Sequence, residues 1–279
     1  MKTNNLAILT FFSATLCGFS EEIAQHPGKF YADQTQALTY TNAAGESMNY
    51  RLFLPKDYDA AKKYPLVLVF HGAGQRGNDN RKQLAPYAAG WIDDAVQSKH
   101  PCILLIPQCP TGKKWVDADW GKGSYSFLAV PITVPMKLVK EILDQVLREK
   151  SVDKNRVYVM GASMGGYGTW NFVMRYPKVV AAAVPVCGGG DPAMADAIKQ
   201  IPIWAFHGDV DSIVPPSGSR DMVNAVKKAG GIKIKLTMYP GVDHGSYLKA
   251  WREPALVEWV FSQSKGTASV AAAGEEGVK

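Results

Sequence analysis

A serine between glycines is the clearest candidate for chemistry in this sequence. It lies in Gly161-Ala162-Ser163-Met164-Gly165, directly after the apolar segment 157–160 and before a segment of helical character at 167–176. A G-x-S-x-G motif between a strand and a helix holds the serine on a tight turn that only small neighbours allow. The helix also points its N-terminus at the serine, which favours negative charge there. The spacing therefore predicts Ser163 as a nucleophile above the end of a strand.

A histidine and carboxylates follow Ser163 in the order that a serine nucleophile needs. A serine hydroxyl reacts slowly until a base takes its proton. The predicted strand 203–206 leads into a segment with two aspartates, and the predicted strand 232–238 is followed by His244. Since the carboxyl ends of parallel strands share one edge of a sheet, we expect His244 to be the general base for Ser163.

The acid that would orient His244 is left open by spacing alone. The candidates are aspartates that follow predicted strands: Asp209, Asp211, Asp191 and Asp196. Asp243 adjoins the histidine and would strain to reach its ring.

The other four histidines have other expected places. His26 lies in a polar lead-in and His100 in a turn before a strand, so we expect both on the solvated surface. His71 and His207 each follow a strand and precede a glycine. We expect these two to brace loops through hydrogen bonds.

A second glycine-rich turn supplies candidates for an oxyanion hole. The predicted strand 66–70 ends in His71-Gly72-Ala73-Gly74. The oxyanion of a tetrahedral intermediate needs two preorganised N–H donors. We expect these donors to be the backbone amides of Ala73 and of Met164, the residue after the nucleophile.

The elements that must position these residues form an alternating series of strands and helices. Six short apolar segments predict strands: 66–70, 102–106, 157–160, 179–186, 203–206 and 232–238. Strands that are apolar on both faces are typical of a mostly parallel sheet with helices on both faces. Before them, 37–41 and 48–54 alternate in character and predict an antiparallel hairpin. The fold class is therefore α/β with three layers.

Three amphipathic helices are predicted between and after the strands. The helix 136–149 has one apolar stripe and an i,i+4 pair of Asp144 with Arg148 on the opposite side. A second helix covers 219–229 with Ser219 as its N-cap. The last helix is expected to bend at Pro254.

Composition and charge exclude several classes of protein. The chain has 279 residues, of which 47% are hydrophobic and 20% charged, and this is ordinary globular composition. The net charge of +6 is spread without a basic cluster, so nothing supports nucleic-acid binding. Four cysteines at irregular spacing contain no CxxC motif, and neither a metal nor a cofactor is predicted. We expect one catalytic domain at 36–262.

Both ends of the chain are expected to lie outside this domain. Residues 1–20 have the charged start, short apolar core and small residues of a signal peptide, which predicts a secreted or periplasmic protein with no membrane span. Residues 21–35 form a lead-in, and 263–279 a disordered tail. The residues before Cys17 match a lipoprotein motif poorly, so lipidation of Cys17 is a minor alternative. Removal of residues 1–20 takes Cys17 away and leaves three cysteines. At least one thiol is then expected to stay free or to pair between chains, and pairing of Cys109 with Cys187 stays open.

These motifs together resemble a known family. The residues that carry the resemblance are His71-Gly72-Ala73-Gly74, Gly161 to Gly166, Pro185 to Asp191, His207-Gly208 with Asp211 and Val214-Pro215, and Pro240-Gly241 with His244. They look like secreted bacterial α/β-hydrolases of the esterase and "predicted peptidase" type, related to polyhydroxybutyrate depolymerases, feruloyl and acetylxylan esterases and the prolyl oligopeptidase catalytic domain. The resemblance implies the α/β-hydrolase fold and Asp211 as the acid. Dienelactone hydrolases are similar in fold but use a cysteine where this chain has Ser163.

The substrate is expected to be an ester. A loop of about 28 residues before the helix 136–149 is long enough to be functional. It carries Trp115 and Trp120, with Tyr125 and Phe127, which could form an acyl or sugar pocket or pack the loop onto the domain. The chain is too short for the propeller of prolyl oligopeptidases, and no lipase lid is found. We therefore expect a serine esterase acting on small-molecule or polysaccharide-linked esters of small or hydroxycinnamic acids. The alternatives are a serine peptidase without propeller and a non-catalytic binding module.

Overall fold

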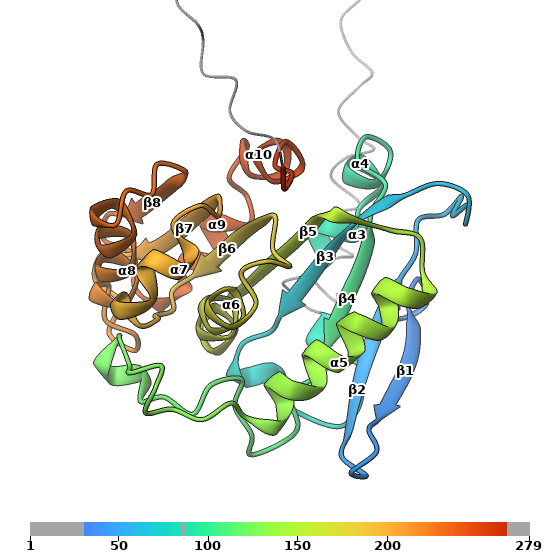
Figure 1. The fold of residues 1–279 in the computed structure, drawn as a ribbon, viewed down its shortest axis with the longest axis horizontal. Coiled ribbons are helices and arrows are strands. Elements are labelled where there is room, and N and C mark those ends of the chain that lie inside the picture. The colour runs from blue at the N-terminus through green and yellow to red at the C-terminus, as the bar shows by residue number, and fades with distance from the viewer. Residues whose placement is uncertain (1–30, 85–87, 267–279) are drawn as a thin grey trace, which may run out of the picture.

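A single eight-stranded sheet organises the protein. The computed structural model describes residues 31–84 and 88–266 (Figure 1). The strands are β1 (Gln36–Thr41), β2 (Ser47–Phe53), β3 (Tyr64–Phe70), β4 (Ile103–Pro107), β5 (Val152–Ala162), β6 (Ala182–Val186), β7 (Ile203–Gly208) and β8 (Ile234–Tyr239). Their order in the sheet is β1-β2-β4-β3-β5-β6-β7-β8. All neighbours from β4 to β8 are parallel, which confirms the predicted fold class.

The N-terminal hairpin forms as predicted and closes one edge of the sheet. β1 and β2 pair antiparallel, from Gln36 opposite Leu52 to Thr41 opposite Ser47. The turn between them is closed by a hydrogen bond from Asn42 N to Glu46 O. Gly45 has a φ of +79°, which few other residues adopt without strain. β2 then pairs antiparallel with β4 and joins the hairpin to the parallel strands.

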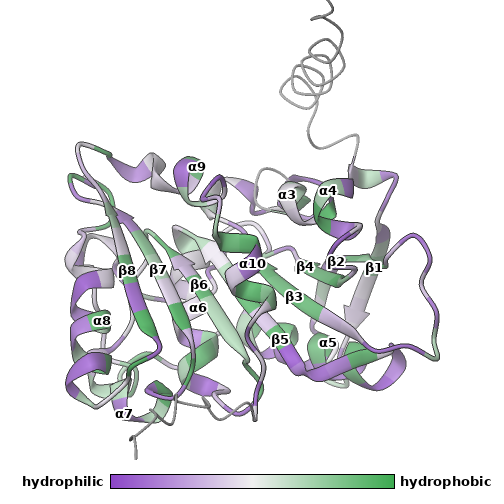
Figure 2. Cartoon of the chain, turned by 90° about the horizontal axis from the view of Figure 1, so that it is seen from above, coloured by the Kyte–Doolittle hydropathy of each residue, from purple (hydrophilic) through white to green (hydrophobic). Residues whose placement is uncertain are grey.

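Helices cover both faces of the sheet. They are α3 (Ala89–Ile92), α4 (Asp94–Gln97), α5 (Val134–Glu149), α6 (Met164–Arg175), α7 (Ala195–Ile198), α8 (Ser217–Lys228), α9 (Tyr247–Ala250) and α10 (Leu256–Phe261). Alternate residues of a strand point to opposite faces. Leu66 and Leu68 of β3 therefore belong to one buried cluster, which includes residues of α5, α6 and α8, whereas Val67 belongs to a second cluster with residues of α3 and α10. Figure 2 shows α3, α4 and α9 on one side of the sheet and α5 on the other.

Helix α5 confirms the predicted apolar stripe but not the predicted ion pair. The side chain of Thr133 caps its N-terminus by accepting a hydrogen bond from Met136 N. Asp144 pairs with Lys140 one turn earlier, at 2.6 Å, rather than with Arg148. Both pairs have i,i+4 spacing, so the spacing alone could not distinguish them.

Two other predicted helices differ from the structure at their ends. α8 begins at Ser217, so Ser219 is not its N-cap but a fully buried residue of the first turn. The last helix is not bent at Pro254; it is split into α9 and α10, with Pro254 in the connection. Proline lacks the N–H that a continuous helix would need. Among residues 31–84 and 88–266, no helix combines the length and apolar character needed to cross a bilayer.

The predicted terminal segments are described only in part. The predicted signal peptide, residues 21–30 of the lead-in and residues 267–279 of the predicted tail lie outside the described residues. Residues 263–266, which the prediction assigned to the tail, make contacts with the domain. Gln263 O accepts a hydrogen bond from Tyr158 Oη at 2.8 Å, and Lys265 N donates to Asn155 O at 2.9 Å.

Candidate active site

Ser163 lies on the sharp turn between β5 and α6. Its φ of +58° and ψ of −122° are in a region that residues other than glycine rarely adopt. The turn packs against the end of β3, where a Cβ atom on Gly165 would lie 2.1 Å from Phe70 O. Only glycine therefore fits there, and the close approach fixes the first turn of α6 beside the residues that follow β3.

A chain of hydrogen bonds joins Ser163, His244 and Asp211. His244 Nε2 lies 2.8 Å from Ser163 Oγ, and His244 Nδ1 lies 2.9 and 3.0 Å from the two carboxylate oxygens of Asp211. Since a carboxylate only accepts, Nδ1 carries the proton and Nε2 is free to accept the serine proton. The His244 side chain is 23% exposed and that of Asp211 is fully buried. This geometry is that of a nucleophile, a base and an acid that orients the base.

Asp211 is held as a buried carboxylate. Its Oδ1 accepts hydrogen bonds from Ile213 N at 3.0 Å and Val214 N at 2.9 Å. Burial by itself would raise the pKa of Asp211, but hydrogen bonds from His207, His244 and Val214 outweigh it and hold the pKa well below its usual range. Asp211 is therefore ionised at neutral pH.

The other candidate acids have different partners. Asp209 Oδ1 accepts from Gly241 N at 2.7 Å, in the turn after β8. Asp191 accepts from the backbone of Ala193 and Phe127, and Asp196 pairs with Lys199 at the surface. Among these four aspartates, the His244 ring has hydrogen bonds only to Asp211.

Asp243, which spacing set aside as the acid, connects the two loops of the site. Its Oδ1 accepts from Ser212 N at 2.7 Å and from His244 N at 2.8 Å, and Ser212 Oγ donates to it at 3.0 Å. The loop that carries Asp211 is thereby tied to the loop that carries His244. Aspartates commonly accept hydrogen bonds from nearby backbone N–H groups. This general preference is the only feature of the sequence that could have indicated that Asp243 joins the two loops.

The predicted oxyanion donors both stand at the start of a helical turn. Ala73 is the first residue of a 3₁₀ turn (Ala73–Gln75), and Met164 is the first residue of α6. The N–H of a first helical residue has no carbonyl partner within its own helix. The contact of Gly165 with Phe70 and His71 carbonyls brings the two turns together. The two amides therefore lie on neighbouring turns, and neither has a carbonyl partner within its own helix.

His71 braces the turn that contains Ala73. It is fully buried, its Nδ1 lies 2.6 Å from Gly72 O, and its Nε2 accepts from Cys109 N at 2.9 Å. Burial lowers the pKa of the His71 imidazole to about 4, so the ring is neutral at physiological pH. The expectation of a bracing role for His71 agrees with this geometry.

The neutral His71 predicts an acid-sensitive contribution to stability. In the unfolded chain its pKa is near 6.5 and in the fold about 4, so between these values only the unfolded state takes up the proton. We expect the free energy of unfolding to fall by about 2 kcal/mol from this group between pH 7.5 and pH 5. Urea unfolding measures the free energy of unfolding at both pH values. The difference between the two values should be smaller in His71→Asn than in the wild type by that amount. An equal pH dependence in the variant would contradict the assignment.

Trp115 does not have the predicted role in substrate binding. Its side chain is fully buried, packs edge-on against Phe70 and His71, and donates from Nε1 to His71 O at 3.0 Å. A ring without exposed surface cannot stack on a substrate. Trp115 instead supports the turn with Ala73 from behind, because the loop folds back into the core.

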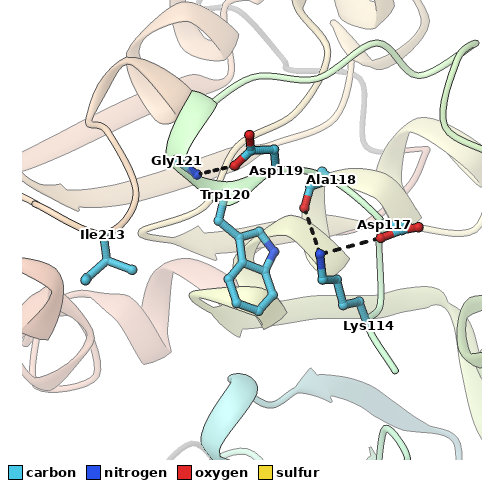
Figure 3. Close-up of a pocket in the computed structure, with 7 residues that line it drawn as sticks. All are labelled: Lys114, Asp117, Ala118, Asp119, Trp120, Gly121 and Ile213. Carbon is cyan, nitrogen blue, oxygen red and sulfur yellow. Dashed lines mark hydrogen bonds and ion pairs between the residues drawn. The ribbon is translucent and has the colours of Figure 1, made fainter. Parts of the chain in front are cut away.

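Trp120 lines an open pocket beside the loop of Asp211. The pocket has a volume of about 510 Å³, and Figure 3 shows its lining: Lys114, Asp117, Ala118, Asp119, Trp120, Gly121 and Ile213. Lys114 Nζ lies 5.1 Å from the centre of the Trp120 ring and 3.5 Å from Asp117 Oδ1. Ile213 is two residues after Asp211 and 53% exposed. The pocket thus combines an aromatic ring, charged groups and an apolar side chain.

The remaining aromatic residues of the long loop pack it onto the domain. Tyr125 Oη accepts a hydrogen bond from Asn171 Nδ2 at 2.7 Å, and the Arg175 guanidinium lies 4.5 Å from the Phe127 ring. His100, expected on the solvated surface, is partly covered: it stacks on Phe261 and contacts Glu258 at 3.0 Å. His26 lies outside the described residues.

The described cysteines are buried thiols. Cys102, Cys109 and Cys187 form no disulfide, and burial raises the pKa of each to about 12. Ligand atoms of Cys187, Asp211 and His244 lie within 4.8 Å of one another, which is close enough to hold a metal ion. A metal needs the thiolate, which this pKa disfavours, and the other two groups bind each other. We therefore assign the cluster to the Ser163 site rather than to a metal.

Known proteins resemble this chain in sequence and in structure. It is 39% identical to a thermostable esterase of known crystal structure, with a TM-score of 0.77 over 84% of this chain and 64% of that one. It is 30% identical to a probable carboxylesterase of Oryza sativa subsp. japonica, over 56% of this chain and 71% of the relative. It is 24% identical to a bifunctional acetylxylan esterase/xylanase of Neocallimastix patriciarum, over 63% of this chain.

The family assignment rests on these similarities together. The chain spans only 23% of the length of the bifunctional enzyme, so that protein's whole activity is not transferred to it. The family model for dienelactone hydrolases matches residues 132–268, a segment that contains Ser163, Asp211 and His244. The chain belongs to the carboxylesterase family, of the α/β-hydrolase type, and its segment 132–268 is a dienelactone hydrolase family domain.

Proposed function

We propose that this protein is a serine hydrolase that cleaves carboxylic esters through an acyl-enzyme. The observation that carries the proposal is the continuous hydrogen-bonded series from Ser163 Oγ through His244 to Asp211. A binding module would not require all three groups in this geometry. The similarity to esterases and carboxylesterases supports the same reaction class.

The reaction follows from the protonation states of the three side chains. His244 Nε2 takes the Ser163 proton as Oγ attacks the ester carbonyl, and the amides of Ala73 and Met164 bind the oxyanion. The tetrahedral intermediate collapses, the bond to the alcohol oxygen breaks, and His244 gives its proton to the leaving alkoxide. Water, deprotonated by His244, then attacks the acyl carbonyl. The bond from the acyl carbon to Ser163 Oγ breaks, His244 returns the proton to Oγ, and the acid is released. Asp211 stabilises the imidazolium in both halves.

We infer that the substrates are esters of small or hydroxycinnamic acids with carbohydrate or aryl alcohols. The aromatic and charged lining of the Trp120 pocket suits a ring that carries hydroxyl groups. The similarity to an acetylxylan esterase supports a small acyl group on a carbohydrate. The alkoxide of an ester leaves more readily than the amide anion of a peptide, so an ester demands less of His244.

A substrate panel tests the proposal. Purified protein is assayed on acetyl, butyryl and feruloyl esters and on peptidyl p-nitroanilides, with Ser163→Ala as the blank. We expect ester cleavage far above the blank. Faster cleavage of the anilides would indicate a peptidase, and background rates on every compound by folded protein would indicate a binding module.

Removal of the Trp120 ring should weaken binding of ring-containing esters selectively. We expect Trp120→Ala to raise KM for acetylated xylosides and methyl ferulate about 10-fold, the effect of losing about 1.4 kcal/mol of contact with the ring. KM for ethyl acetate should change less than twofold. The control is Trp259→Ala, which removes an indole that packs on Trp204 away from the pocket. Equal effects on all esters would exclude Trp120 from substrate recognition.

We also propose that the protein is exported by the N-terminal segment 1–20. The basis is the sequence pattern of that segment alone. N-terminal sequencing of protein from cell fractions checks it: a mature form outside the cytoplasm that begins near Glu21 is expected, and an intact cytoplasmic form would contradict it.

A further inference from the structure

His207 is a second buried histidine at the acid end of the site. It stands near the end of β7, and its side chain has no exposed surface. Its Nε2 lies 3.0 Å from Val214 O and 3.3 Å from Asp211 Oδ2, and its Nδ1 lies 2.8 Å from Ser219 Oγ. The carboxylate of Asp211 is thus flanked by His244 on one side and His207 on the other.

The partners of His207 place a proton on its Nε2. Val214 O only accepts, so Nε2 carries a proton and donates a hydrogen bond to Val214 O at 3.0 Å, with Asp211 Oδ2 3.3 Å from the same nitrogen. Ser219 Oγ lies 2.8 Å from His207 Nδ1 and donates a hydrogen bond to Gly188 O at 3.2 Å. Ser219 thereby links the His207 ring to the loop that follows β6.

Ser219 reaches this position only because α8 begins at Ser217. It is fully buried in the first turn of α8, and its hydroxyl faces the end of β7 instead of capping the helix. A Cβ atom on Gly218 would lie 3.0 Å from Gly188 O, so α8 packs tightly against the loop that follows β6. This tight packing fixes the position of the Ser219 hydroxyl, and the contact with Ser219 Oγ fixes the orientation of the His207 ring.

We propose that His207, held by Ser219, is a positioning residue that orients Asp211 and disperses its negative charge. The inference rests on the proposed ester hydrolysis at Ser163. His207 Nε2 contacts Asp211 Oδ2 at 3.3 Å, and this contact restricts rotation of the carboxylate, whose two oxygens lie within 3.0 Å of His244 Nδ1. The lowering of the Asp211 pKa by its hydrogen bond with His207 supports this geometry.

The other charged and titratable groups that face Asp211 cannot replace His207. Cys187 after β6 and Tyr167 in α6 are neutral at physiological pH, because burial raises the pKa of both. Asp243 carries a like charge on the opposite loop. His244 must itself change its protonation state during each turnover. His207 is therefore the side-chain donor beside this carboxylate that takes no part in the proton transfer.

Two substitutions at position 207 separate a positioning role from a structural one. Glutamine can place an amide N–H where Nε2 donates, whereas leucine cannot donate. We expect His207→Leu to lower kcat about 10- to 100-fold with KM changed less than twofold, as for loss of a charge-assisted hydrogen bond. His207→Gln should recover most of this loss. Ser219→Ala should lower kcat by a smaller factor, since the ring keeps its other partners.

The pH dependence of kcat/KM distinguishes a positioning role from a loss of folded protein, because a smaller amount of folded enzyme lowers the rate equally at every pH. Without Nε2–H, more negative charge remains on Asp211 and holds the imidazolium of His244 more strongly. The acid limb of kcat/KM should then move to higher pH by about half a unit in His207→Leu and stay in place in His207→Gln. Rates are normalised by titration of active sites with a fluorophosphonate.

A double-mutant cycle tests whether His207 acts through Asp211. We expect His207→Leu to cost little additional kcat in an Asp211→Asn background. Additive losses, an unmoved acid limb, or a glutamine variant no better than leucine would overturn the proposal. An inactive wild-type enzyme would instead refute the proposed ester hydrolysis. Thermal melting of each variant shows whether a loss of activity is a loss of fold.

Discussion

Ser163→Ala should lower the rate of ester hydrolysis by about 10⁶-fold, the size of the loss when the nucleophile of a serine protease is removed. The alanine cannot form the acyl-enzyme, and His244 Nε2 loses the hydroxyl that lies 2.8 Å away. Measurement of kcat on p-nitrophenyl acetate checks the loss, and a fluorophosphonate should label the wild type at Ser163 and leave the variant unlabelled. Labelling at another residue would contradict the assignment.

The same position allows a matched control for its backbone strain. With a φ of +58°, Ser163 occupies a conformation that costs a residue with a Cβ atom about 1–3 kcal/mol. Ser163→Gly should be as inactive as Ser163→Ala but more stable by an amount in that range, less what glycine gains in freedom when unfolded. If the two variants unfold at the same urea concentration, the turn stores no strain.

Asp211→Asn should lower kcat by about 10⁴-fold, as in a protease triad whose aspartate is replaced. The amide cannot hold His244 as the Nδ1–H tautomer, so Nε2 no longer faces Ser163 as an acceptor. The matched control is Asp209→Asn, two residues away. Asp209 accepts only from Gly241 N among its hydrogen bonds in the described residues, and an asparagine oxygen can do the same. A larger loss from Asp209→Asn would transfer the acid role to Asp209.

The positions of these residues follow from the sheet. β5, β7 and β8 are parallel, so Ser163 follows the end of β5, Asp211 the end of β7 and His244 the end of β8. A Cβ atom on Gly208 would lie 2.0 Å from Val242 O, so the loops after β7 and β8 are in direct contact. That contact brings Asp211 and His244 together, and Asp243 strengthens it through Ser212.

Features that depend on neighbours in the chain could be predicted from the amino-acid sequence. The sharp turn at Ser163 is encoded within a few residues, because the strand, the glycines and the helix follow one another directly. The hairpin of β1 and β2 is local in the same way, and the apolar segments were sufficient to predict a mostly parallel sheet. The order of Ser163, the aspartates and His244 was also visible, although their spacing left the acid open until a family resemblance favoured Asp211.

Contacts between groups that are distant in the chain could not be predicted without the fold. Asp211 and His244 are 33 residues apart and His244 and Ser163 are 81 apart, so their contacts depend on the pairing of β7 with β8 and on the loops beyond them. Trp115 and Trp120 have the same residue type and lie five positions apart in one loop. Trp115 is buried under His71, whereas Trp120 lines a pocket, because the fold of the loop decides which ring meets the core.

Ser219 and His207 show most clearly that local sequence patterns do not predict the partners of a buried side chain. A serine before an amphipathic segment predicts an N-cap, and a histidine before a glycine predicts a braced loop. The structure starts α8 two residues earlier and turns the serine hydroxyl toward His207, which in turn contacts Asp211. Local patterns encode secondary structure because hydrogen bonds within a turn span few residues. The environment of a buried polar group is set by packing between elements, which only the complete fold defines.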